Sequence, residues 1–178
     1  MKWMIASDIH GSAKYCELMM QAFQKEQADM LLLLGDLLYH GPRNDLPEDY
    51  APKKVISMLN TMSSKIVCVR GNCDCEVDQM VLNFPIMADY VVLNTGKKLI
   101  YATHGHHWNE KNPLPMPAGS VLLCGHTHVP KNTDYKGFSY MNPGSVSLPK
   151  ENSFHSYMVE NKGIFVWKNL LTDEEYIV

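Results

Sequence analysis

The stretch VLLCGHTHVP, Val121–Pro130, joins an apolar run to two histidines placed one residue apart. Because the run Val121–Cys124 is short and ends at a glycine, it predicts a buried β-strand. Gly125 then predicts a tight turn. In an extended chain alternate side chains point to the same side, so His126 and His128 are expected to face one place. Paired imidazoles at a strand end indicate a binding site there.

The chain begins with a similar pattern. The apolar run Lys2–Ser7 predicts a buried strand, and Met30–Gly35 predicts a second one. Between them, residues 11–27 carry apolar side chains at the i, i+3, i+4 spacing of an amphipathic helix. A strand–helix–strand order favours a parallel pair of strands with a right-handed crossover.

The remaining elements change in character along the chain. A loop at 37–50 and a helix at 51–62 precede the strand Lys65–Arg70, and a short helical segment spans 75–82. The second half is mostly β. It contains two strands within 90–104 joined by a turn at Asn94–Gly96, a proline-rich loop, and strand candidates at 121–124, 137–141, 155–160 and 164–170. Two packed sheets flanked by helices, within a single α/β domain over 1–178, accommodate both halves.

Composition excludes several classes of protein. The chain has 178 residues, of which 46% are hydrophobic and 20% charged, as in globular proteins. A net charge of −3 argues against a general nucleic-acid or membrane-surface binder. No apolar run approaches the ~20 residues of a membrane helix, and the N-terminus is too polar for a signal peptide. Five cysteines without framework spacing favour the reducing cytoplasm.

Polar residues follow one apolar strand after another. In open α/β sheets, ligands bind at the carboxyl ends of strands. Taken singly, each such residue is most simply a turn, cap or solvated residue. The recurrence at five strand ends is better explained by one shared site. The residues concerned are Asp8, His10, Asp36, Asn72, Cys73, Asp74, His104, His126 and His128.

The chemistry of this set indicates divalent metals. Carboxylate, imidazole and amide ligands suit Mn, Fe, Zn, Co or Ni. A zinc ribbon is disfavoured because no Cys-x-x-Cys pair exists, and Cys73 and Cys75 are interpreted as loop thiols. Seven residues are enough for two ions that share one ligand. Two divalent ions, offset by two aspartates and a hydroxide, leave a net positive site that attracts anions. Paired ions of this kind suit displacement at phosphorus.

The ordered motifs Asp-x-His, Gly-Asp, Gly-Asn, Gly-His and Gly-His-x-His, from Asp8 to His128, resemble the calcineurin-like metallophosphoesterase family. GNCD, the HGPRN loop (His40–Asn44) and NPGSVSLPK (Asn142–Lys150) are similar to those of its small bacterial phosphodiesterase subgroup.

The resemblance implies a four-layer α/β/β/α sandwich and a dinuclear site. It implies two divalent ions, with manganese as the first expectation and Ni, Zn, Fe, Co or Mg as alternatives. A metal-bridging hydroxide would attack a small phosphodiester directly. One ion would be held by Asp8, His10 and His128, the other by Asn72, His104 and His126, with Asp36 bridging. The residues implied in catalysis are Asp36, Asn72, Cys73 and His104.

One position departs from the wider family, where a histidine commonly follows the asparagine and protonates the leaving group. Cys73 stands there instead, and a thiol of pKa ~8.5 is less well matched to neutral pH than imidazole. Good leaving groups are therefore expected, with Cys73 assisting at most. Roles in substrate binding stay open for His40, Arg43 and His106, whereas His155 and Ser145 are assigned to structure.

Two alternative functions remain. A phosphomonoesterase could use the same site, and a comparison of matching aryl mono- and diesters would separate the two activities. A non-catalytic scaffold, similar to a eukaryotic retromer subunit, is disfavoured because all seven ligand positions carry competent residues. Base rates for soluble proteins favour a homodimer, although no residue identifies an interface.

Overall fold

The computed structural model describes all residues from Met1 to Val178 and contains two sheets and three α-helices. The helices are α1 (Ala13–Lys25), α2 (Pro52–Asn60) and α3 (Glu76–Val81), with a 3-10 turn at Ser63–Lys65. The strands are β1 (Lys2–Ala6), β2 (Met30–Leu33), β3 (Ile66–Cys68), β4 (Tyr90–Asn94), β5 (Leu99–Thr103), β6 (Ser120–Leu123), β7 (Lys131–Tyr135), β8 (Phe138–Asn142), β9 (Ser156–Asn161), β10 (Ile164–Asn169) and β11 (Glu175–Tyr176). None of the helices has the length and apolar character needed to cross a bilayer.

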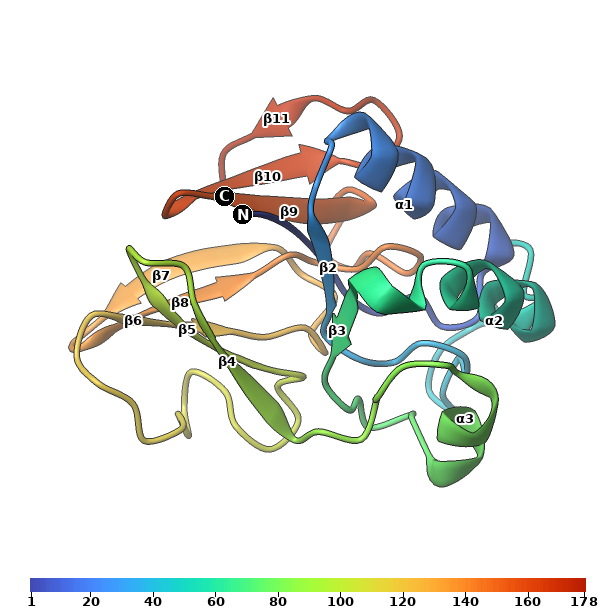
Figure 1. Ribbon diagram of the computed structural model, residues 1–178, viewed down its shortest axis with the longest axis horizontal. Helices are drawn as coiled ribbons and strands as arrows, with labels where there is room; N and C mark the ends of the chain where they lie inside the picture. The colour runs from blue at the N-terminus through green and yellow to red at the C-terminus, as the bar shows by residue number, and fades with distance from the viewer.

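Both sheets combine parallel and antiparallel pairs. The six-stranded sheet runs β11-β10-β9-β1-β2-β3, and the five-stranded sheet runs β4-β5-β6-β8-β7. The predicted parallel pairing of β1 with β2 is confirmed, and β3 continues it. The hairpin predicted between β4 and β5 is also confirmed. In Figure 1 the two sheets lie one over the other, with α1 and α2 on the outer face of the six-stranded sheet.

The alternation of side chains along β1 creates two cores. Met4 and Ala6 pack with residues of α1 and α2, whereas Trp3 and Ile5 pack between the sheets against residues of β5 and β6. Because both faces of the parallel strands are covered, their sequences are almost continuously apolar. This layering confirms the expected α/β fold with two packed sheets.

The outer face of the five-stranded sheet is covered by a loop instead of a helix. Residues 105–119 contain no helical segment. Leu114 in this loop packs with Leu122 and Tyr140 of the sheet, and Trp108 adds to the cluster. The fourth layer of the predicted sandwich is therefore coil, as the loop below β5 and β6 in Figure 1 illustrates. Three prolines in this segment are consistent with its lack of a helix.

Two strands, β7 and β11, were not predicted from the sequence. Strand β7 reads KNTDY and lies at the edge of its sheet, largely exposed, so it has no apolar run to reveal it. Strand β11 has only two residues. Edge strands are commonly short or polar, which limits unwanted pairing with other chains.

Candidate metal centre

The seven residues expected to bind metal lie together where strands of both sheets end. Segments that follow β1, β2, β3, β5 and β6 supply them. Asp8, His10, Asp36, His104 and His128 are buried, while Asn72 and His126 lie toward solvent. Residues far apart in the chain therefore converge on one buried polar cluster.

A first group brings together Asp8, His10 and His128. The Nε2 atoms of His10 and His128 lie 3.2 Å apart, although 118 residues separate them in the chain. The Asp8 Oδ1 atom lies 3.3 Å from His128 Nε2 and 3.6 Å from His10 Nε2. Three potential ligand atoms thus face one point.

A second group brings together Asn72, His104 and His126. The His104 Nε2 atom lies 3.0 Å from Asn72 Oδ1 and 3.2 Å from His126 Nδ1. His126 therefore presents its Nδ1 atom to the group, whereas His104 presents Nε2. The two histidines of the Gly-His-x-His motif belong to different groups.

Asp36 lies between the two groups. Its Oδ2 atom is 3.7 Å from His10 Nε2 and 3.5 Å from His104 Nε2. Its Oδ1 atom accepts a hydrogen bond from the Cys73 backbone N–H at 2.8 Å. This bond fixes the carboxylate so that one oxygen faces both groups.

Backbone carbonyls fix the orientation of three imidazoles. The Nδ1 atoms of His10, His104 and His128 lie 2.8, 2.6 and 2.6 Å from the carbonyl oxygens of Tyr39, Leu34 and Leu148, respectively. Because a carbonyl only accepts, each Nδ1 carries a hydrogen and donates it. In the neutral ring the Nε2 lone pair is then free, which is the arrangement of metal-binding histidines.

Metal ions fit these residues. The Asp8 Oδ1 atom is buried and has no hydrogen-bond partner. Two pairs of imidazole nitrogens face each other at 3.2 Å. Nitrogens sharing an ion at ~2.1 Å would lie roughly 3.0–3.4 Å apart for bond angles of about 90–109°. The donor set of carboxylate, imidazole and amide suits borderline divalent ions.

The electrostatics of the cluster also favour cations. Burial raises the pKa of Asp8, but the neighbouring imidazoles of His10 and His128 outweigh burial and hold this pKa well below its usual range. Burial lowers the pKa of His104, yet Asp36 prevails and raises it to about 9. Two buried carboxylates thus create a field that stabilises positive charge.

Five of the seven residues have left-handed backbone conformations, which are uncommon outside glycine. The φ values of Asp8, His10, Asp36, His126 and His128 are 60°, 49°, 56°, 68° and 62°, respectively. The expectation that Asp-x-His and His-x-His converge by simple strand alternation is therefore wrong, because both pairs lie in kinked segments beyond their strands. Strained backbone of this kind clusters at functional sites.

Two glycines allow the segments to approach closely. A Cβ atom on Gly71 would lie 2.1 Å from Asp36 Oδ1, and one on Gly125 would lie 2.0 Å from Ser7 Oγ. The tight turn expected at Gly125 is present, because the Thr127 N–H donates to the Gly125 carbonyl at 2.8 Å. The positive φ of this turn falls on His126, and Gly125 is needed for the close approach to the end of β1.

Three residues outside the predicted ligand set hold the strained segments through hydrogen bonds to the backbone. Both Asp74 oxygens accept backbone N–H groups, from Asp36 at 2.8 Å and Gly71 at 2.7 Å through Oδ2 and from Leu37 at 2.9 Å through Oδ1. The hydroxyls of Ser145 and Ser147 donate to the Asp8 carbonyl. The structural role expected for Ser145 thus includes the backbone of a metal-site residue.

The other candidates lie around the centre. Burial, followed by the proximity of Asp36, raises the pKa of the Cys73 thiol to about 12. The His106 ring lies beside that of His104 in a tilted arrangement, with ring centroids 5.3 Å apart, and His40 packs against Tyr39 and Tyr50. His155 stacks on Tyr15 away from the centre, with ring centroids 4.0 Å apart.

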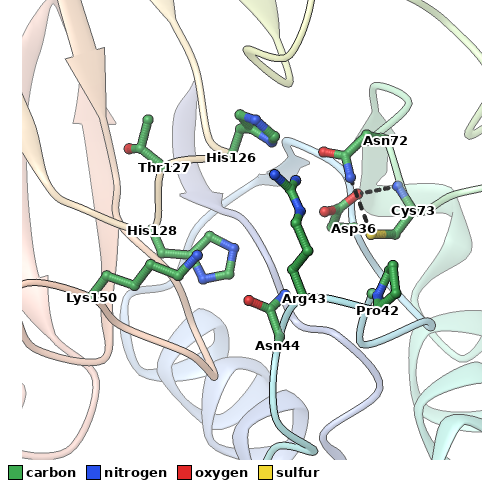
Figure 2. Close-up of a pocket in the computed structure, with 11 residues that line it drawn as sticks. Asp36, Pro42, Arg43, Asn44, Asn72, Cys73, His126, Thr127, His128 and Lys150 are labelled. Carbon is green, nitrogen blue, oxygen red and sulfur yellow. Dashed lines mark hydrogen bonds between the residues drawn. The ribbon is translucent and has the colours of Figure 1, made fainter.

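A cavity of about 280 Å³ opens beside the metal-site residues. Figure 2 shows Arg43 and Lys150 reaching into it from different segments, in front of His126 and His128. One of its eleven lining residues is hydrophobic. The lining residues are Asp36, Gly41, Pro42, Arg43, Asn44, Asn72, Cys73, His126, Thr127, His128 and Lys150.

Residues 1–161 match the calcineurin-like phosphoesterase superfamily domain, and the chain belongs to this family. Its fold and its cluster of potential metal ligands are those of a metal-dependent phosphoesterase. The chain is 46% identical over 162 residues to phosphodiesterase YfcE of Escherichia coli K12, covering 90% of this chain and 88% of the relative.

Solved structures agree with this assignment. A structure of the E. coli phosphoesterase YfcE matches with a TM-score of 0.96 at 42% identity, covering 99% of this chain and 97% of the other. Vps29 from Entamoeba histolytica shares the fold at 18% identity, with a TM-score of 0.64 and coverage of 99% and 96%. The enzyme assignment rests on the closer similarity, so the scaffold alternative is not supported.

Proposed function

We propose that this protein is a dinuclear-metal phosphodiesterase acting on small phosphodiesters. The observation that carries the proposal is the convergence of Asp8, His10 and His128 on one point and of Asn72, His104 and His126 on another, with Asp36 between them. The 46% identity to a protein named phosphodiesterase YfcE supports the diester preference.

In this proposal each group of ligands holds one divalent ion and Asp36 contacts both. Manganese is the proposed metal, and Ni, Zn, Fe, Co and Mg are the alternatives to be compared. When bound, the ions supply Lewis-acid charge at phosphorus and hydroxide at neutral pH.

The residues of the chain then have separate tasks. Carbonyl-bound Nδ1–H groups keep the imidazoles of His10, His104 and His128 in one tautomer and orientation. The backbone N–H of Cys73 keeps Asp36 facing both groups. Such fixed positions lower the reorganisation needed during the reaction.

Cys73 has a minor chemical role in this proposal. Its thiol lines the cavity, but a pKa of about 12 makes it a weak proton donor at neutral pH. Leaving groups that depart without protonation, such as aryl alcohols, are therefore favoured. The cytoplasm and a homodimeric state, both expected from the sequence, stay part of the proposal.

The test is a comparison of metals and substrates on metal-stripped protein. Mn, Ni, Zn or Mg is added separately, and hydrolysis of bis(p-nitrophenyl) phosphate and p-nitrophenyl phosphate is followed. We expect activity only with added metal and a higher kcat/KM for the diester. A higher kcat/KM for the monoester would make the protein a phosphomonoesterase, and no hydrolysis with any metal would refute the enzymatic proposal.

A further inference from the structure

The cavity beside the metal centre has more positive charge than a simple phosphodiester can neutralise. Two divalent ions, less the charges of Asp8, Asp36 and a hydroxide, leave one net positive charge, which one phosphodiester balances. Arg43 and Lys150 also line the cavity and add two further positive charges. The one acidic residue of the lining is Asp36, which belongs to the metal centre.

Neither basic side chain is neutralised by the protein. Arg43 and Lys150 take part in none of the ion pairs of the structure. Both side chains are exposed within the cavity and free to bind a ligand. Figure 2 shows the Arg43 side chain extending toward His126 and Asp36, and the Lys150 side chain extending toward His128.

The backbone under each cation is held in place. Arg43 lies in a tight turn closed by the Asn44 N–H to the Gly41 carbonyl at 3.4 Å, with Pro42 fixing the turn. The Asn44 side chain donates to the His40 carbonyl at 2.8 Å. On the other wall, the Lys150 N–H donates to the carbonyl of His128 at 3.2 Å. The backbone from which each side chain extends is thus held by hydrogen bonds, and that of Lys150 is joined directly to the metal-site residue His128.

The lining also restricts the organic part of a substrate. Ten of the eleven lining residues are not hydrophobic, and none is Phe, Tyr or Trp, so the cavity offers little apolar surface to a large organic group. A volume of about 280 Å³ is at the small end for ligand sites. The cavity therefore suits a small, hydrophilic and highly anionic molecule.

We propose that Arg43 and Lys150 bind a second phosphoryl group of the substrate, so that the natural substrate is a phosphodiester of a small hydrophilic alcohol phosphate. A terminal phosphate carries about −1.5 to −2 charge at neutral pH, which matches the two cations. Arginine binds phosphate oxygens through two parallel N–H groups, and lysine adds a point charge. This inference rests on the proposed phosphodiesterase function.

The test uses two substrates that differ by one phosphate, the p-nitrophenyl phosphodiesters of glycerol and of glycerol 3-phosphate, with the manganese-loaded enzyme. We expect kcat/KM to be about 10-fold or more higher for the second, mainly through KM, because charge-assisted contacts contribute in the bound state. In the double variant Arg43→Gln/Lys150→Gln, the ratio of the two kcat/KM values should fall to about 1. Lys162→Gln, on the turn between β9 and β10, is the matched control and should preserve the ratio.

A wild-type ratio near 1, or a ratio unchanged in the double variant, would overturn the inference while leaving the phosphodiesterase function intact. If neither diester is hydrolysed, the proposed function fails, and calorimetry still decides the inference. Propane-1,3-diol bisphosphate should bind the wild type about 10-fold more tightly than the double variant, whereas n-propyl phosphate should show a smaller difference. Equal losses for both ligands would refute the second phosphate site.

Discussion

The carboxylate of Asp74 accepts the backbone N–H of Asp36 at 2.8 Å, and the same oxygen accepts the backbone N–H of Gly71 at 2.7 Å. One buried side chain therefore ties the segment after β2 to the segment after β3. Since these segments carry Asp36 and Asn72, Asp74 controls the spacing between a shared ligand and a ligand of the second group.

Replacing Asp74 by Asn tests this link. An amide keeps the shape but offers one accepting oxygen, so at least one of three backbone N–H groups loses its partner. We expect the free energy of unfolding to fall by ~1–3 kcal/mol and metal affinity to fall ~10–100-fold. Urea unfolding and metal titration measure these effects. Asp45→Asn, at an exposed position, is the control, and equal behaviour of the two variants would contradict the prediction.

His126→Ala and His128→Ala should affect different ions. His128 faces Asp8 and His10, whereas His126 faces His104. We expect each variant to lower the bound metal from about two equivalents to about one, with strong loss of activity. Metal analysis of the purified variants measures this, with exposed His107→Ala as the control. Loss of both ions in both variants would show that the two groups do not act separately.

Gly71→Ala tests the close approach to Asp36. The new methyl would lie 2.1 Å from Asp36 Oδ1, so the carboxylate has to move. Displacements of ~1 Å in a catalytic site can cost ~100-fold in rate, and we expect a decrease of about that size in kcat/KM. Gly119→Ala strains the backbone locally, because φ is 85° there, but it has open space around its Cβ, lies away from the metal centre and should retain activity. A fully active Gly71→Ala enzyme would rule out the steric explanation.

A comparison of Cys73→Ala with Asp36→Ala tests whether the Cys73 thiol only assists the reaction or is essential for it. Alanine keeps the backbone N–H that Cys73 donates to Asp36 and removes only the thiol. We expect Cys73→Ala to lower the rate of hydrolysis of an aryl phosphodiester by less than ~10-fold. A general acid would contribute ~10²–10⁴-fold. Asp36→Ala should lower kcat by ~1,000-fold. If both variants were equally inactive, Cys73 would be an essential residue.

Asp173 lies away from the metal centre, and its lowered pKa predicts that the free energy of unfolding depends on pH. Hydrogen bonding with Lys25, then with Tyr157 and Lys168, lowers its pKa to about 2, compared with ~3.9 in unfolded chains. A lowered folded-state pKa stabilises the protein above the unfolded value, and this contribution is lost as the pH falls through about 2.

Asp173→Asn should therefore lower the free energy of unfolding by ~1 kcal/mol at pH 6, allowing for solvent screening. The difference should shrink as the pH decreases from about 4 toward 2. Urea unfolding of both proteins across this range measures it. Asn also tolerates the left-handed conformation at this position, where φ is 63°. A difference that did not change with pH would exclude the carboxylate charge as its cause.

The sequence revealed the strands and their polar ends because apolar runs and the residues that follow them are local patterns. It revealed neither the polar edge strand β7 nor the roles of Asp74, Ser145 and Ser147, since those depend on hydrogen bonds to distant backbone. The kinks at Asp8 and His128 were likewise invisible, because only tertiary contacts hold non-glycine residues in that conformation.

The hydrogen bonds from Ser145 and Ser147 to the Asp8 carbonyl have a consequence for biosynthesis. A ribosome makes Asp8 about 140 residues before the hydroxyl groups that hold it. Strand β1 also pairs with β9, an antiparallel neighbour that is synthesised much later. The metal centre is therefore completed only after Ser147 and β9 have been synthesised, so a shorter nascent chain displays its carboxylates and imidazoles without the geometry that gathers them around an ion.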